Sequence, residues 1–228
     1  MSSNKPPQNP HYYNYKPTRK YSESRMRVGG PGYGFVHPAP TPVSAPVSAP
    51  VSAPAPTPVS GLLLITSFEG FSAKAYVDPA SGGLPITIGF GSIRNQNGDA
   101  FKLGDTITRP EAEKLLADQI EQKYLPSLRK ILYWSEMSDG KQGALLSFAY
   151  NLGAKFYGSP DFETITRVLK NKEWNKVPDA FYLYNKASGK VLLGLARRRA
   201  AEGSAWKNNT IDEEEIKIIK NKILSELP

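Results

Sequence analysis

The chain contains no cysteine, and its two histidines, His11 and His37, both lie in the first forty of its 228 residues. The first absence excludes disulfides and thiolate metal sites. The second leaves the rest of the chain without an imidazole for a Ser-His-Asp triad or a zinc site. Hydrolytic chemistry there must use carboxylates, hydroxyls, amides, lysines or arginines, so we expect no cofactor and no metal.

Large apolar residues are scarce in residues 1–60. This segment holds 13 of the 20 prolines, six Lys or Arg against one Glu, and three tandem Val-Ser-Ala-Pro units over 43–54. A segment of this composition buries too little apolar surface to offset the loss of chain entropy. We therefore predict that 1–60 is a disordered, basic and Tyr-rich tail followed by a Pro/Ala/Val/Ser linker.

A long apolar run is also lacking. The longest one near the end of the tail, Gly61-Leu-Leu-Leu-Ile65, is far too short to cross a bilayer, and the N-terminus has no secretory signal. The net charge of +8 favours anionic partners, and five of these charges belong to the tail.

The remaining residues show the patterns of an α+β domain. Strand alternation is found over 73–77 and 86–90, which indicates a β-hairpin in a small lobe. Helical periodicity and capping signals then indicate a larger helical lobe, with a cleft between the two. We assign 61–207 to one folded domain and 208–228 to a C-terminal helix that packs on it or extends it. The expected helices cover 62–70, 108–123, 138–153, a segment from 161, pieces of 173–184, 192–206 and a segment from 210.

Two acidic residues flank the start of this hairpin. A helix ending at Glu69 and a strand ending at Asp78 can bring two carboxyls to opposite sides of one groove. Hydrolysis of a glycosidic bond needs this arrangement, because one carboxyl protonates the leaving oxygen while the other activates water or attacks the sugar. On spacing alone, two solvated surface charges remain the commoner interpretation.

Three segments together carry a more specific signal. The first contains Glu69-Gly70, Tyr76-Val-Asp78 and Thr87-Ile-Gly-Phe-Gly91, the second is Gln142 to Gly153, and the third is Gly194 to Arg199 with Glu202. In order and separation they resemble the phage-type lysozymes, glycoside hydrolase family 24, over roughly residues 61–207. One departure is the distance from Asp78 to Thr87, which is nine positions where the family usually has six. The additional residues have the composition of a turn, so a longer hairpin tip accommodates them.

The resemblance implies a lysozyme-like fold and a muramidase that cleaves the β-1,4 bond between N-acetylmuramic acid and N-acetylglucosamine of peptidoglycan. It implies that Glu69 is the general acid and that Asp78, aided by the Thr87 hydroxyl, holds and activates the attacking water. Such a mechanism inverts the anomeric centre. It further implies a monomer that waits in the host cytoplasm before lysis, or one mounted on a virion.

Two alternatives remain open. A lytic transglycosylase needs an acid/base carboxyl without a catalytic water, and Asp78 argues against it. A virion structural or cell-wall-binding protein could keep the fold while the tail acts through contact with the virion or an anionic wall. The aromatic and basic residues of 11–35 permit such a contact but indicate no dedicated nucleic-acid site, and a solvated segment is the commoner interpretation.

Several residues of the helical lobe are secondary candidates. Of the three consecutive arginines at 197–199, we expect one to pair with a site carboxylate or an acidic group of the wall and the other two to be solvated, because neighbours on a helix point about 100° apart. Asn151 is a candidate sugar contact. The aromatic side chains of Phe148, Tyr150 and Trp206 are interpreted as core rather than as a saccharide surface.

Overall fold

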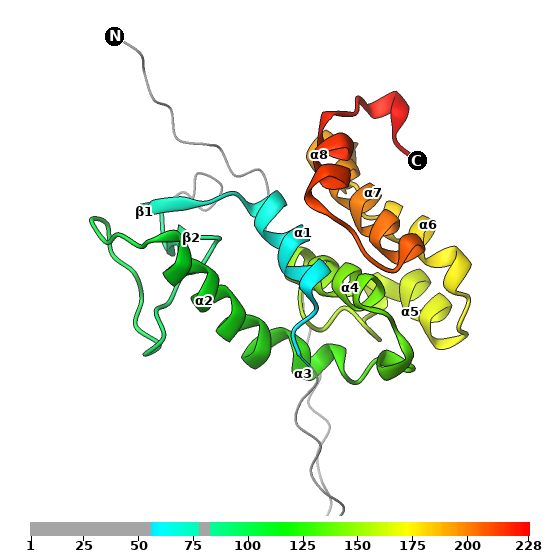
Figure 1. Cartoon of the computed structure of the whole chain (residues 1–228), viewed down its shortest axis with the longest axis horizontal. Coiled ribbons are helices and arrows are strands. Elements are labelled where there is room, and N and C mark those ends of the chain that lie inside the picture. Colours follow the sequence, from blue (N-terminus) through cyan, green and yellow to red (C-terminus); the bar gives the residue numbers. More distant parts are fainter. Residues whose placement is uncertain (1–55, 78–82) are drawn as a thin grey trace, which may run out of the picture. The chain divides into compact units, whose positions relative to one another are not determined.

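The computed structural model describes residues 56–77 and 83–228, drawn as coloured ribbon in Figure 1. The tail assignment for 1–55 and the candidate Asp78 lie outside the described residues. Mixed α+β architecture is confirmed: a small lobe carries a hairpin and a larger lobe consists mostly of helices. None of the helices in the described ranges is long and apolar enough to cross a membrane.

The small lobe is built on strands β1 (Ser72–Val77) and β2 (Ile86–Gly89), which pair antiparallel. Tyr76 lies opposite Thr87, and the register shifts between Ser72 and Tyr76. All four residues of β2 are buried. Helix α2 (Arg109–Gln119) covers part of this strand, since a Cβ placed on Gly89 would come within 3.0 Å of the Ala112 Cβ.

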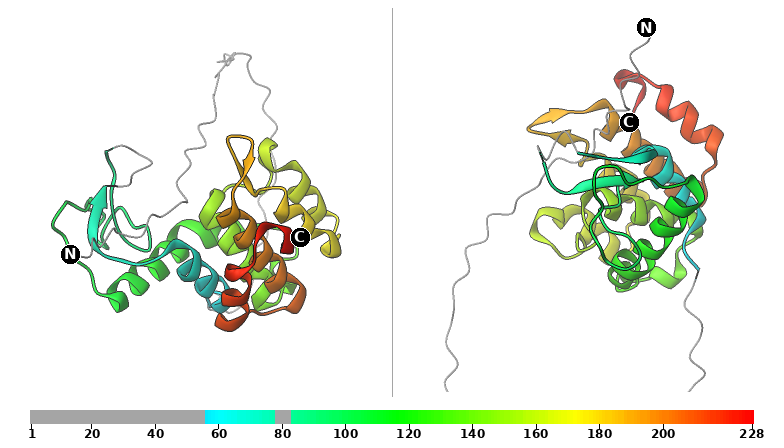
Figure 2. Two further views of the ribbon diagram at one scale, coloured as in Figure 1. Left: turned by 90° about the horizontal axis from the view of Figure 1, so that it is seen from above. Right: turned by 90° about the vertical axis from the view of Figure 1, so that its left-hand side faces the viewer.

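Helix α2 leads from the hairpin toward the helical lobe (Figures 1 and 2). Thr108 and Glu111 form a capping box at its start. The helix continues as a π-helical segment, Ile120–Tyr124, in which the N–H of Leu125 donates to the carbonyl of Ile120. Pro126, which has no N–H to donate, opens the short helix α3 (Leu125–Leu128).

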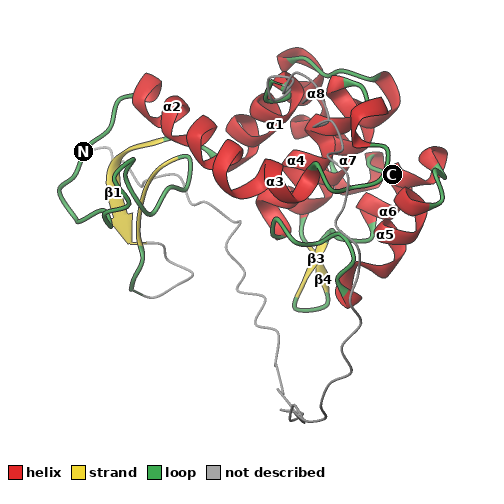
Figure 3. Cartoon of the chain, turned by 90° about the horizontal axis from the view of Figure 1, so that it is seen from below, coloured by secondary structure: helices red, strands yellow, loops and turns green. Residues whose placement is uncertain are grey.

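The helical lobe is centred on α4 (Asp139–Leu152) and α7 (Leu193–Asn208), which pack against each other (Figure 3). Ala144, Leu145 and Phe148 lie on the predicted core stripe of α4 and are fully buried. Around these two helices lie α5 (Glu163–Lys170), α6 (Val177–Tyr182) and α8 (Glu213–Asn221), with short 3-10 turns at 134–136, 160–162, 174–176 and 224–226.

Helix α1 (Val59–Glu69) packs closely on α4. Gly143 makes the approach possible, because a Cβ at this position would lie 2.5 Å from the Gly61 nitrogen. The first turn of α1 receives its cap from another helix: the Asp139 carboxylate accepts from the N–H groups of Val59 (2.7 Å) and Ser60 (2.9 Å). These bonds satisfy two of the donors that a helix start leaves unpaired.

Several sequence-based element boundaries differ from the structure. Helix α1 starts at Val59 rather than 62, because Asp139 supplies its cap. The last helix starts at Glu213 with Asp212 as its N-cap, rather than at 210 as we expected. A short hairpin of β3 (Lys186–Ala187) and β4 (Lys190–Val191) was not predicted; its turn places Ser188 at φ 49° and Gly189 at φ 77°.

The Asp139 cap predicts where the chain can be shortened. A chain that begins at residue 56 keeps every described contact of α1, so we expect its free energy of unfolding to lie within about 0.5 kcal/mol of the full chain. A chain that begins at 61 loses Val59 and Ser60, and should be destabilised by about 1–2 kcal/mol, as for a lost N-cap. Urea denaturation monitored by circular dichroism measures both.

Asp139→Ala provides the control. In the chain from 56 it should cost about as much as removing 56–60. In the chain from 61 it should cost only about 0.5 kcal/mol, because only the favourable position of the acid in the first turn of α4 is then lost. Additive losses would show that Asp139 and the start of α1 act independently.

Candidate functional site

Glu69 is the last residue of α1, and it is 6% exposed. Gly70 follows with φ 71°, a left-handed conformation that ends the helix at the lowest cost for glycine. The chain then enters β1. A carboxyl is thereby placed at the junction between the helical lobe and the hairpin, as the sequence predicts.

Arg198 of α7 binds Glu69 directly. Its Nη1 lies 2.5 Å from the Glu69 Oε1, and both side chains are almost completely buried. Of the three consecutive arginines, Arg198 is therefore the one that pairs with the candidate carboxylate, as expected for one of the three. The expectation that the other two are solvated is wrong for Arg199, which is 1% exposed and binds the buried Glu202. Arg197 instead donates from Nε to the carbonyl of Lys222.

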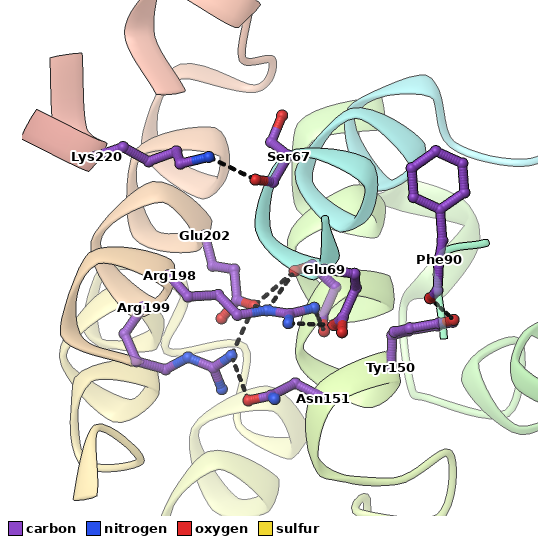
Figure 4. A network of polar contacts seen from close by, with 10 residues as sticks. Ser67, Glu69, Phe90, Tyr150, Asn151, Arg198, Arg199, Glu202 and Lys220 are labelled. Carbon is purple, nitrogen blue, oxygen red and sulfur yellow. Dashed lines mark hydrogen bonds and ion pairs between the residues drawn. The ribbon is translucent and has the colours of Figure 1, made fainter. Parts of the chain in front are cut away.

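Glu202, one turn further along α7, is the centre of the same network (Figure 4). Its Oε1 accepts from the Ser147 hydroxyl at 2.7 Å, from Arg199 Nη2 at 2.9 Å and from Arg198 Nε at 3.4 Å. Arg198 also donates from Nη2 to the Ser147 carbonyl at 3.1 Å. Helices α1, α4 and α7 are thus joined by one buried polar cluster.

The charges in this cluster shift one another's proton affinities. Burial lowers the pKa of Arg198, but the carboxylates of Glu69 and Glu202 raise it by more, so the guanidinium stays charged. Burial lowers the pKa of Arg199 to about 10 against the opposing effect of Glu202. Burial raises the pKa of Glu202, while Arg199 and Arg198 oppose that rise. The cluster is therefore strongly coupled.

Asn151 belongs to this cluster as well. Its Oδ1 accepts from Arg199 Nη2 at 3.1 Å, so at least this amide oxygen serves a buried arginine. Phe148 and Trp206 are buried at 0% and 2% exposure, which confirms their assignment to the core. The half-buried Tyr150 instead connects the lobes, since its hydroxyl donates to the Phe90 carbonyl at 3.0 Å (Figure 4).

Two further contacts surround the end of α1. Burial and then the negative charge of Glu69 raise the pKa of Tyr124 to about 12, so this phenol is neutral at physiological pH. Lys220 of α8 donates from Nζ to the carbonyl of Ser67 at 2.7 Å (Figure 4). The C-terminal helix thus contacts the catalytic candidate's own helix within two residues of Glu69.

Thr87 lies on β2 and is 2% exposed. It is directly opposite Tyr76, and residues that face each other in an antiparallel pair share one face of the sheet. In sequence, Asp78 follows Val77, the last residue of β1. Among the described candidates, Glu69 is bound into the α7 network and Thr87 lies on the hairpin.

The family model for phage lysozyme matches residues 66–202, more than half of the chain. The chain belongs to the phage lysozyme family. The matched range begins three residues before Glu69 and ends at Glu202, so it includes the buried cluster but neither the tail nor α8.

Curated relatives of this phage lysozyme family member are endolysins. The endolysin of Bacillus phage B103 is 34% identical over 143 residues, which cover 63% of this chain and 51% of the relative. The endolysin of Salmonella phage P22 is 32% identical over 143 residues, which cover 61% of this chain and 90% of the relative. The aligned chain thus spans about half the length of the first Bacillus phage relatives.

Solved phage lysozymes have the same fold. An endolysin from Escherichia coli O157:H7 phage FAHEc1 superposes with a TM-score of 0.59 at 25% identity, covering 71% of this chain and 99% of that one. A P22 lysozyme variant superposes with a TM-score of 0.57 at 27% identity, covering 67% of this chain and 99% of that one. The lysozyme-like fold expected from the sequence is confirmed.

The function of Ser147 and Glu202 in the network was missed at the level of sequence. Glu202 was noticed as part of a motif, yet without a role. A usable signal exists: Arg198, Arg199 and Glu202 share helical spacing with small residues at 200, 201 and 203, and such small neighbours indicate a helix face packed closely on another element.

Breaking the buried pair should destabilise the phage lysozyme domain strongly. We expect Arg198→Ala to lower the free energy of unfolding by about 3–5 kcal/mol, since it leaves Glu69 and Glu202 with uncompensated charge in the interior. Arg197→Ala is the matched control. It removes one hydrogen bond to a carbonyl and should cost about 1 kcal/mol in the same urea titration. If the two variants lose the same free energy of unfolding, the buried pair of Arg198 stabilises the domain no more than the hydrogen bond of Arg197 does.

Proposed function

We propose that this protein is a peptidoglycan hydrolase of the lysozyme type, which cleaves the β-1,4 bond between N-acetylmuramic acid and N-acetylglucosamine. The observation that carries the proposal is the placement of Glu69. This carboxyl ends a helix at the base of the hairpin, is held by Arg198, and lies inside the segment matched by the family model. The names of the endolysin relatives support the same activity.

The reaction that we propose uses two carboxyls in different roles. Glu69 donates its proton to the leaving glycosidic oxygen. Asp78, aided by the hydroxyl of Thr87, positions a water and accepts its proton as the water attacks the anomeric carbon. Because water attacks from the side opposite the leaving group, the product has inverted configuration. An inverting pair requires a carboxyl separation of about 6.5–9.5 Å.

We also propose a division of labour along the chain. Residues 61–207, with the supporting contact of α8, carry the chemistry. The tail contributes to contact with an anionic wall or a virion, because its charge is strongly positive for its length. The protein would act on the wall as a monomer from the host cytoplasm once the membrane is breached, or from a particle.

Glu69→Gln is expected to abolish wall lysis while leaving the fold intact. The amide is nearly isosteric but cannot donate the proton, and general acid catalysis contributes roughly 10²- to 10⁴-fold. Turbidity loss of permeabilised bacterial cells gives the rate. Glu113→Gln, which removes only an exposed pair with Arg109, is the control and should retain full activity.

The chemical nature of the products separates the alternatives. A hydrolase releases free reducing ends, and nuclear magnetic resonance of fresh products should show the inverted anomer first. Anhydro sugars would instead identify a lytic transglycosylase. Wall binding without cleavage by the wild-type protein would identify a binding or structural protein and refute the proposed function.

Thr87 is expected to act through its hydroxyl. Thr87→Val keeps the shape of this buried side chain and removes the hydroxyl, so we expect activity to fall at least about tenfold, as for loss of one group that positions a reactant. Thr87→Ser keeps the hydroxyl and should retain most of the activity. If both variants lose the same fraction of activity, Thr87 contributes through its packing rather than by positioning water.

A further inference from the structure

Arg198 presents a positive charge to Glu69 at contact distance. Its Nη1 lies 2.5 Å from the Glu69 Oε1, and the Arg198 side chain is fully buried. A general acid has to hold a proton until the bond breaks, so the charge around Glu69 bears directly on its proposed role. A group that shares Arg198 with Glu69 alters that charge.

Glu202 is placed to do this. Arg198 contacts Glu202 through Nε and Glu69 through Nη1, so one guanidinium is shared between two carboxyls. The three donors on Glu202 Oε1 stabilise its ionised form and hold it in place from two helices, through Ser147 of α4 and the two arginines of α7.

With both glutamates ionised, the charges of this cluster balance. Arg198 and Arg199 then provide two positive groups and Glu69 and Glu202 two negative ones, with exposed fractions between 0% and 6%. Solvent screens charges weakly at such depth, so removing one of them alters the balance felt by the other three.

We propose that Glu202 is a positioning residue of the hydrolytic site: it fixes Arg198 and takes up part of its charge, and thereby lets Glu69 hold the proton that it donates. The proposal rests on the proposed function and assigns Glu202 an effect through Arg198, without contact to substrate.

Other polar groups that face this cluster come from three elements. Helix α4 contributes Ser147, Tyr150 and Asn151, and the π-helical segment contributes the neutral phenol of Tyr124. Helix α8 contributes Lys220, whose ammonium binds the Ser67 carbonyl at the exposed edge, where water screens it. Within the described residues, the balance in the interior is therefore set by the two arginines and two glutamates.

The test is the pH dependence of wall lysis. Glu202→Gln leaves an excess of positive charge around Glu69, which favours its ionised, inactive form. The basic limb of the pH–rate profile should therefore move to lower pH by about one unit, the lower end of the effect of an adjacent charge. At a pH one unit above the midpoint of the wild-type limb, the ratio of the variant rate to the wild-type rate should therefore be roughly tenfold lower than the same ratio at acidic pH. Taking the variant-to-wild-type ratio at each pH removes the titration of the wall itself.

Arg199→Gln makes the opposite change. It leaves an excess of negative charge, so the basic limb should move to higher pH. The double variant Glu202→Gln/Arg199→Gln restores the balance and should return the limb to the wild-type position. Arg199→Gln carries the test alone if Glu202→Gln does not fold. Glu215→Gln, a glutamate of α8 bound to Ser204 and Asn208, is the control that should leave the profile unchanged.

The outcomes separate this proposal from the proposed function. If wild-type protein does not hydrolyse walls, or Glu69→Gln keeps full activity, the function fails. If wild type is active, but folded Glu202→Gln and Arg199→Gln show an unmoved limb, Glu202 only contributes to stability and the proposal is overturned. A limb that moves in the same direction in both variants overturns it equally.

Discussion

The architecture around the candidate site depends on the buried ion pair between Glu69 and Arg198. Two charges removed from water carry a large desolvation cost, which is offset only when geometry is good and the remaining donors and acceptors find partners. The structure meets much of this demand with Ser147, Asn151, Arg199 and Glu202. The requirement to satisfy one buried arginine therefore explains why α1, α4 and α7 meet where they do.

The same cluster relates stability to reactivity. Arg198 holds the carboxyl of Glu69 in a defined position, yet it also presents a full positive charge to a group proposed to act as an acid. A second carboxylate on the same guanidinium reconciles the two demands, since it leaves the geometry in place and reduces the net charge. Residues distant from any substrate can in this way have a large share in the chemistry of a glycosidase.

Much of the fold could be predicted from local signals. The capping box at Thr108, the core stripe of α4 and the glycine that ends α1 all depend on residues within a few positions of one another, so the sequence pattern contains them. That consecutive arginines of α7 have different partners followed from helical geometry.

Other features were not predictable because their partners lie far away in sequence. Helix α1 begins at Val59 because an aspartate 80 positions later caps it. Helix α2 packs on Gly89 of β2, a contact that strand alternation does not contain. The role of Glu202 became visible only when α1 and α4 were placed beside α7, since its helical spacing alone is equally typical of a surface ion pair.

The helix that carries Glu69 is held almost entirely by parts of the chain that follow much later. Val59 binds a partner 80 residues away, Glu69 one 129 residues away, and Ser67 one 153 residues away. Contacts of such separation form slowly, because a long loop must close before they stabilise anything. During synthesis on the ribosome, α1 emerges before all three of these partners, and the set of contacts is complete only after α8 has emerged. A growing chain that has not yet reached α7 therefore lacks Arg198, the partner that holds Glu69 in place.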